Sequence, residues 1–171
     1  MQPNWGVGRI ALSYKEAINL LISLAVTDMM DASLLTGHLK PIQRKLIATF
    51  SRPDQRKIKQ LRNRLRAGPV IPATTLQAYA LTQGGQVTDR LQEAFLMMRK
   101  ARIRYQSKQR VRTRRTVEVH YLVLGYPVWY ALCWDKLRSA VRSFRLDRIE
   151  SVELRDTVFT LRPYSEFEES M

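Results

Sequence analysis

The stretch that decides the fold runs from Val128 to Ile149 and reads VWYALCWDKLRSAVRSFRLDRI. Two runs of apolar, aromatic and β-branched residues flank the polar segment Asp135 to Arg138, and this pattern predicts a β-hairpin. In the first strand Trp129 and Tyr130 point to opposite faces, because successive side chains of a strand alternate. Neither face is polar, which is typical of a strand that is buried between layers or lies in the wall of a small closed barrel. We expect the barrel.

Further strands are expected on both sides of this hairpin. Ala101 to Gln106 and Thr113 to Leu124 have the composition of strands and are joined by a polar tip, and Gly125-Tyr126-Pro127 turns the chain into the hairpin. Ser151 to Arg155 alternates between polar and apolar residues as a fifth strand. Five short strands with tight connections favour an SH3-like or Sm-like barrel.

Helices are expected before the barrel. Ser13-Tyr14-Lys15-Glu16 matches a capping box, so a helix begins there, and its many apolar residues indicate burial in a bundle or at a dimer contact. Pro41 to Phe50 predicts a second helix, and Pro53 to Arg66 predicts a third that Gly68-Pro69 stops.

The segment that leads to the barrel is expected to be a linker with one short helix, from Gly68 to Gly85. Thr88 and Asp89 then cap a helix that runs to Lys100 and packs on the barrel. The predicted fold class is therefore α+β. A helical connector or dimerisation region occupies residues 1–86, the five-stranded barrel occupies residues 87–167, and a tail occupies residues 168–171.

An ordered set of motifs surrounds the hairpin. Trp129-Tyr130 is followed by Asp135 and by the segment Phe144 to Ile149, FRLDRI. Farther from the hairpin lie Ile103-Arg104-Tyr105, Arg115-Thr116-Val117-Glu118 and Leu161-Arg162-Pro163-Tyr164. From Leu91 to Phe167 this set resembles the WYL domain, the sensor module of many bacterial transcription regulators. Ala131 stands where the family has Leu, and Val119 stands where it has Pro.

The resemblance implies an Sm-like barrel and an effector that is an oligonucleotide or is nucleotide-like. Regulators of this family carry a winged helix-turn-helix before the helical region, and Gly6 to Ile10 resembles the segment by which the chain leaves that wing. We expect the DNA-reading part either to precede Met1 in a longer protein or to be absent.

The charge of the chain points to a polyanionic partner. Among 171 residues, 29 are Lys or Arg and 15 are Asp or Glu, so the formal net charge is +14. Nucleic acid is favoured over an anionic membrane surface, and the alternative is a basic surface that serves solubility. Seven of these cations lie on the helix predicted at 53–66 or directly before it. They can contact phosphates, although the basic face of such a helix is usually only exposed to solvent.

The segment from Arg99 to Arg115 contains no acid. Arg102 and Arg104 share a strand face opposite Ile103 and Tyr105, so both are expected outside the core. The weaker nucleic-acid-binding candidates, which all lie in this segment, are Arg102, Arg104, Arg110, Arg112 and Arg114.

The main candidate site uses the segment that carries the resemblance. Arg142 and Arg148 lie at its two ends, and guanidinium groups suit phosphates or carboxylates. Aromatic side chains nearby can stack on bases, or can simply belong to the core. The predicted ligand-binding residues are Tyr105, Arg115, His120, Tyr130, Trp134, Arg142, Arg145 and Arg148. The alternatives are that the arginines satisfy carbonyls and acids such as Glu118 or Glu150 and that His120 is structural. Asp147 is expected to pair with one neighbouring arginine and leave the other free, and the alternative is an ordinary turn aspartate.

Several classes of protein find no support in the sequence. The single cysteine, Cys133, excludes a disulfide framework, and neither His38 nor the pair Asp28 and Asp31 has the companions of a metal or catalytic site. We find no phosphate-binding loop, nucleophile elbow, signal peptide or apolar run of membrane-spanning length. We therefore expect a cytoplasmic protein without enzymatic activity, metal, cofactor or membrane partner.

The favoured function is the ligand-sensing and dimerisation part of a WYL-family transcription regulator. It would form a homodimer through the helix that begins at Ser13 and bind an anionic effector, either a nucleotide or a single-stranded oligonucleotide. The alternative is an Sm-like module that acts directly on RNA or single-stranded DNA.

Overall fold

The computed structural model describes residues 11–30, 39–69 and 85–170. The predictions for Gly6 to Ile10, for Asp31, for His38 and for most of the linker lie outside the described residues. The chain divides into two compact units, one up to Arg62 and one from Asn63 onward. The predicted boundary between residues 86 and 87 stays a prediction.

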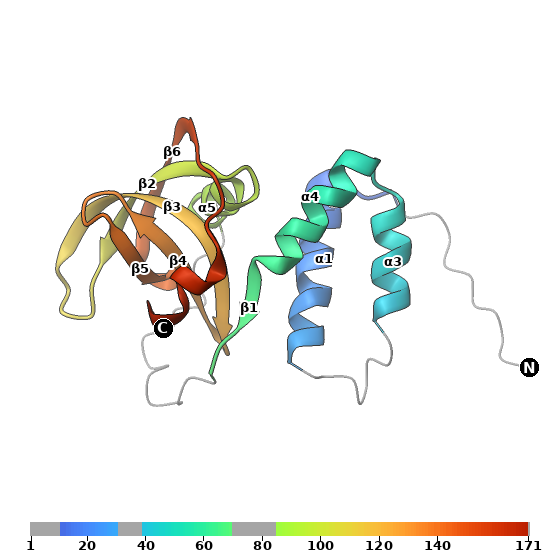
Figure 1. Cartoon of the computed structure of the whole chain (residues 1–171), viewed down its shortest axis with the longest axis horizontal. Helices are drawn as coiled ribbons and strands as arrows, with labels where there is room; N and C mark the ends of the chain where they lie inside the picture. Colours follow the sequence, from blue (N-terminus) through green and yellow to red (C-terminus); the bar gives the residue numbers. More distant parts are fainter. Residues whose placement is uncertain (1–10, 31–38, 70–84, 171) are drawn as a thin grey trace, which may run out of the picture. The chain divides into compact units, whose positions relative to one another are not determined.

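The first unit contains three described helices, α1 (Tyr14–Met29), α3 (Lys40–Ala48) and α4 (Arg52–Asn63) (Figure 1). The predicted capping box at the start of α1 is confirmed: the Ser13 amide donates to Glu16 Oε2 over 2.8 Å, and the Glu16 amide donates to Ser13 Oγ over 3.3 Å. The hydrogen bonds from Ser13 lower the pKa of Glu16. One face of α1 is buried through Ala17, Ile18, Leu21 and Ala25.

The third predicted helix is shorter than expected. α4 ends at Asn63, and Leu65–Ala67 forms strand β1 instead of a last helical turn. β1 pairs in parallel with β3, with Leu65 opposite Leu122 and Ala67 opposite Leu124. The hydrogen bonds between β1 and β3 and the burial of Leu65, which is 5% exposed, outweigh the helical pattern that predicted a helix as far as Arg66.

In its described residues, the second unit consists of a sheet, the helix α5 and short 3-10 turns (Figure 1). Helix α5 spans Gln86–Leu96, so it begins before Thr88 and ends before Lys100, which lies in β2. The strands are β2 (Arg99–Gln106), β3 (Arg112–Gly125), β4 (Val128–Asp135), β5 (Ala140–Arg145) and β6 (Ile149–Val158). The 3-10 turns are η2 (Leu146–Arg148), η3 (Tyr164–Glu166) and η4 (Glu168–Ser170).

The predicted hairpin is confirmed. β4 and β5 pair antiparallel from Tyr130–Arg145 to Asp135–Ala140. The Asp135 carboxylate closes the turn by accepting a hydrogen bond from the Leu137 amide over 2.9 Å.

The sheet is open, so the predicted SH3-like or Sm-like barrel is not confirmed. Its strand order is β5-β4-β3-β2-β6, with β1 added beside β3. β5 and β6 lie at the two ends of this order and are not paired to each other in the described structure. The fold class is mixed α+β with a six-stranded sheet.

The register assigns side chains to two faces of the sheet. The first face is the apolar core and includes Ala101, Ile103, Val117, Val119 and Cys133, each at most 1% exposed. On the second face, Tyr121, Val123 and Leu132 cluster with Phe167 of a C-terminal strap, residues 159–167. The part of the second face on β2 and the start of β3 carries exposed arginines.

Candidate anion-binding site

The exposed arginines of β2 and β3 form one cluster, which we call the basic face: Arg102, Arg104, Arg112 and Arg114. Arg104 lies directly opposite Arg114 in the ladder, and on the other edge of β2 it lies opposite Ser151. The prediction that Arg102 and Arg104 point away from the core is confirmed, since both are exposed while Ile103 is 1% exposed. Alternation along two paired strands therefore gathers these cations on one surface.

A pocket lies on this surface. Its volume is about 230 Å³, and its lining consists of Arg102, Ile103, Arg104, Arg114, Ser151 and Glu153. The lining residues thus include three arginines, one serine and one glutamate. Guanidinium groups donate to phosphate oxygens, whereas the hydroxyl and carboxylate can accept hydrogen bonds from a ligand.

Acids neutralise the basic face only in part. Glu150 pairs with Arg104 and with Arg112, each over 2.8 Å, and Glu153 lies 3.8 Å from Arg102. The hydrogen bond from Arg112 is the largest cause that lowers the pKa of Glu150. Burial opposes this shift, and the charges of Arg112 and Arg104 add to it. Within the described parts of the chain, Arg114 has no acidic partner.

Arg110 lies apart from this pocket. It is an exposed residue of the tip between β2 and β3, with a positive φ of 62° and its amide donating to the Ser107 carbonyl over 3.0 Å. Arg110 therefore adds a positive charge at the tip, beyond the basic face.

The predicted ligand-binding residues divide between the two faces of the sheet. Arg115 and Tyr105 lie on the first face: Arg115 donates to the buried Asp135 over 3.2 Å, and Tyr105 packs edge-on against Phe144. Arg142 also lies on the first face, opposite Cys133, but it is exposed on the edge strand. The register therefore does not gather all eight residues at one place.

Tyr130 and Trp134 lie on the second face, where the C-terminal strap partly covers them. The Arg162 guanidinium stacks 3.9 Å from the centre of a Trp134 ring, and Tyr130 packs against the apolar cluster around Tyr121. The strap is held by two further bonds, from Tyr121 Oη to the Arg162 carbonyl over 2.7 Å and from the Arg162 amide to His120 Nδ1 over 3.2 Å. A base cannot stack on this face of Trp134 while Arg162 occupies it.

His120 is a structural residue in this fold. It is fully buried between Phe159 and Phe167, and its Nδ1 accepts a hydrogen bond, so the ring is neutral. Burial lowers the pKa of His120 to about 4, although Glu118, with Oε2 3.6 Å from Nε2, opposes this shift. Glu118 is itself held by Lys100 at 3.4 Å and Lys136 at 3.2 Å.

Arg145 and Asp147 form a two-bond ion pair. Arg145 Nε and Nη2 donate to the Asp147 carboxylate over 3.0 and 2.7 Å, and both side chains are less than a tenth exposed. The bond to Asp147 raises the pKa of Arg145. The predicted pairing of Asp147 with one arginine is confirmed, and Arg148 in η2 is half-buried with no acidic partner in the described structure.

Sequence reasoning missed Arg64, because its position suggested a solvated helical arginine. Its side chain is buried and donates to three backbone carbonyls, those of His120, Phe95 and Val119, over 2.7 to 2.8 Å. Ser151 and Glu153 of the pocket were also missed as site residues, although the alternation of the fifth predicted strand places both on its polar side.

No helix among the described residues has the length and apolar character that crossing a bilayer requires. The described residues also bring no three His, Cys, Asp or Glu side chains together as metal ligands would be. Burial raises the pKa of the Cys133 thiol, which is enclosed in the core.

Comparison with known proteins agrees with the motifs around the hairpin. Residues 86–154 match the family model of the WYL domain. The chain is also similar to a solved structure, proteasome accessory factor B/C (PafBC) of Arthrobacter aurescens, at 25% identity and a TM-score of 0.38. That match covers 87% of this chain and 21% of the other, so the chain spans about a fifth of that protein's length. Residues 86–154 of this protein are a WYL domain.

Proposed function

We propose that this protein is the sensory part of a WYL-family transcription regulator and that its WYL domain binds an anionic effector on the basic face. The effector is a nucleotide or a single-stranded oligonucleotide. The observation that carries the proposal is the pocket in which Arg102, Arg104 and Arg114 meet, with Arg114 unneutralised by any acid of the described chain.

The chemistry of the pocket favours a nucleotide over inorganic phosphate. Guanidinium forks bind phosphate oxygens, and Glu153 would repel a bare anion but accept a hydrogen bond from a base N–H or a ribose hydroxyl. A volume of about 230 Å³ is small for a ligand pocket, so it accommodates one nucleotide unit while further phosphates lie along the open surface.

Titration of a short fluorescent single strand against the full chain tests the site. Arg102→Gln/Arg114→Gln should weaken binding on the order of tenfold, because two phosphate contacts are lost. Arg142→Gln/Arg148→Gln is the matched control. It removes the same charge from two ligand-binding residues that were predicted from the sequence and lie outside the pocket. Retention of full affinity by the first variant and loss by the second would move the site to the edge of the sheet at β5.

A second candidate is direct binding of RNA or single-stranded DNA as the output of the protein. The observation that favours it is the continuation of the basic face toward the tip, where Arg110 and Arg112 are exposed. Such binding would grow with strand length and would not be displaced by a mononucleotide, whereas an effector site saturates with one short ligand.

We further propose a non-enzymatic, cytoplasmic homodimer that associates through α1. Leu21 is buried within the chain itself, but Leu20 is 41% exposed and Tyr14 is 48% exposed, so apolar surface remains on this helix. Sedimentation velocity should show a dimer at micromolar concentration and a monomer for Leu20→Gln. A monomeric wild-type protein under these conditions contradicts the dimer.

A further inference from the structure

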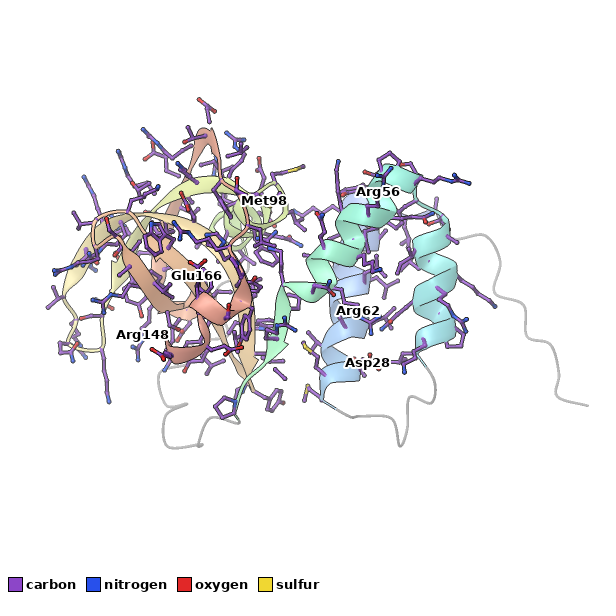
Figure 2. All side chains as sticks on the ribbon, in the orientation of Figure 1. Asp28, Arg56, Arg62, Met98, Arg148 and Glu166 are labelled. Carbon is purple, nitrogen blue, oxygen red and sulfur yellow. The ribbon has the colours of Figure 1, made fainter. Side chains whose placement is uncertain are left out.

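Helix α4 has two chemically distinct faces. Ile58 and Leu61 are 4% and 6% exposed and anchor the helix in the first unit. The opposite face carries Arg52, Arg56 and Lys59, which recur at i, i+4 and i+7 and are all exposed. We call these three residues the α4 stripe; Figure 2 labels Arg56 within it.

The stripe differs from the other cations of the same helix. Lys57 pairs with Asp54 at 3.6 Å, and Arg62 pairs with Asp28 of α1 at 3.0 Å (Figure 2). None of the three stripe residues has an acidic partner among the described residues. Like charges at these spacings destabilise a helix, so the stripe is a cost to folding that an anionic partner would relieve.

The stripe does not have the features of a membrane-binding helix. An interfacial helix inserts its apolar face among lipids, but the apolar face of α4 is already buried in the protein. The stripe also offers no stacking platform for single strands, because α4 contains no aromatic residue. What remains is a row of cations on a straight helix, separated by about 6 Å and about 4.5 Å along the axis.

We infer that α4 binds the sugar-phosphate backbone of duplex nucleic acid through Arg52, Arg56 and Lys59. Each side chain contacts a different phosphate, and the contacts carry no sequence information because they do not reach base edges. The charge of the first unit agrees with an anionic partner. Its described residues include few acids, and α3 adds the cations Lys40, Arg44 and Lys45. The stripe residues belong to the first unit, and the basic face belongs to the second.

Two variants of the full chain test the inference. Arg56→Gln/Lys59→Gln removes two stripe cations, and Lys57→Gln/Arg62→Gln removes one lysine and one arginine that are already paired with acids. Glutamine is a good helix former, so α4 should persist in both, and circular dichroism checks this. The probe is a short DNA duplex of mixed sequence, titrated over a range of salt concentrations.

The stripe variant should bind the duplex more weakly, on the order of tenfold or more, and the slope of log K against log salt should fall by about 2. The control should keep the slope of the wild type. Equal losses in the two variants, or an unchanged slope in the stripe variant, overturn the inference. Stripe-dependent binding to vesicles of anionic lipid without binding to the duplex overturns it in favour of a membrane.

The result of the duplex titration can be distinguished from the result for the proposed effector site on the basic face. Arg102→Gln/Arg114→Gln should leave the stripe's contribution to the duplex slope intact. The stripe variant should leave mononucleotide binding by the WYL domain unchanged.

Discussion

Arg64 stabilises the second unit through backbone carbonyls rather than through an acid. Its guanidinium satisfies the carbonyls of Val119 and His120, where the register of β3 against β4 shifts, together with the carbonyl of Phe95 near the end of α5. The Phe95 ring lies under the same group at 3.9 Å. Burial lowers the pKa of Arg64 to about 10, which still leaves it charged at neutral pH.

Replacement of Arg64 by leucine should therefore be costly. The three carbonyls would lose their donor inside the protein, and we expect a loss of about 3 kcal/mol in the free energy of unfolding. Arg62→Leu is the control, because Arg62 is 51% exposed and its ion pair should contribute about 1 kcal/mol or less. Urea unfolding measures both, and similar losses in the two variants would contradict the role given to Arg64.

The pKa of His120 predicts how stability depends on pH. The folded protein lowers this pKa from 6.5 to about 4, so the unfolded chain binds the proton more tightly. The resulting stability is fully present above pH 6.5 and is lost as the pH falls toward 4, with a total of about 3 kcal/mol.

His120→Asn isolates this contribution. The asparagine oxygen can replace Nδ1 as acceptor for the Arg162 amide, but it does not titrate. The variant should be less stable than wild type at pH 7, and the difference should shrink as the pH approaches 4. A constant difference in urea unfolding between pH 7 and 4.5 would show that His120 does not titrate in this range.

At the scale of elements, the turn η2 is fixed to β5 by the ion pair of Asp147 with Arg145. Both side chains are nearly buried, so Asp147→Ala would leave the arginine without its counter-charge and should cost about 3 kcal/mol. Asp156→Ala is a suitable control, because Asp156 pairs with Arg99 at 2.9 Å but is fully exposed. Equal melting temperatures for wild type and Asp147→Ala would reduce Asp147 to an ordinary turn residue.

The elements that could be predicted from sequence are those with a clear local pattern. The apolar and aromatic run of Val128–Asp135, the alternation from Ser151 to Arg155 and the capping box at Ser13 are such patterns, and each led to an element that the structure contains. Strand β1 could not be predicted, because three residues after a helix carry no period and their conformation depends on the distant edge of β3. Closure of the sheet likewise depends on whether β5 meets β6, which no local pattern encodes.

The candidate site shows the same limit. The prediction that Arg102 and Arg104 lie outside the core was correct, because the alternation of side chains depends only on the strand itself. Alternation could not show that Arg162 from the C-terminal strap stacks on Trp134, or that Arg115 pairs with Asp135. Those contacts join residues that are 28 and 20 positions apart, and only the folded sheet brings them together.

At the scale of the whole molecule, the positive charge is distributed over two units with different surfaces. The first unit presents a row of cations on a helix, and the second presents a cluster on a sheet with a pocket. Each unit therefore carries part of the net charge of +14 as a local cluster of cations.

Truncation can test where the WYL domain begins as a folding unit. The matched region and our predicted boundary both start near residue 86, but β1 and Arg64 lie before it. A fragment of residues 86–171 would lack the three carbonyl bonds of Arg64, the buried Leu65 and the bond from the Gly68 amide to the Leu124 carbonyl at 2.9 Å.

We expect the fragment 63–171 to unfold cooperatively and the fragment 86–171 to be less stable by about 3 kcal/mol or more. Because β1 pairs with β3 through its own backbone, a peptide of residues 63–69 added to the shorter fragment should raise its melting temperature. The same peptide with Arg64→Leu should not. Equal stability of the two fragments would place the start of the folding unit at residue 86 and would make β1 a dispensable addition to the edge of the sheet.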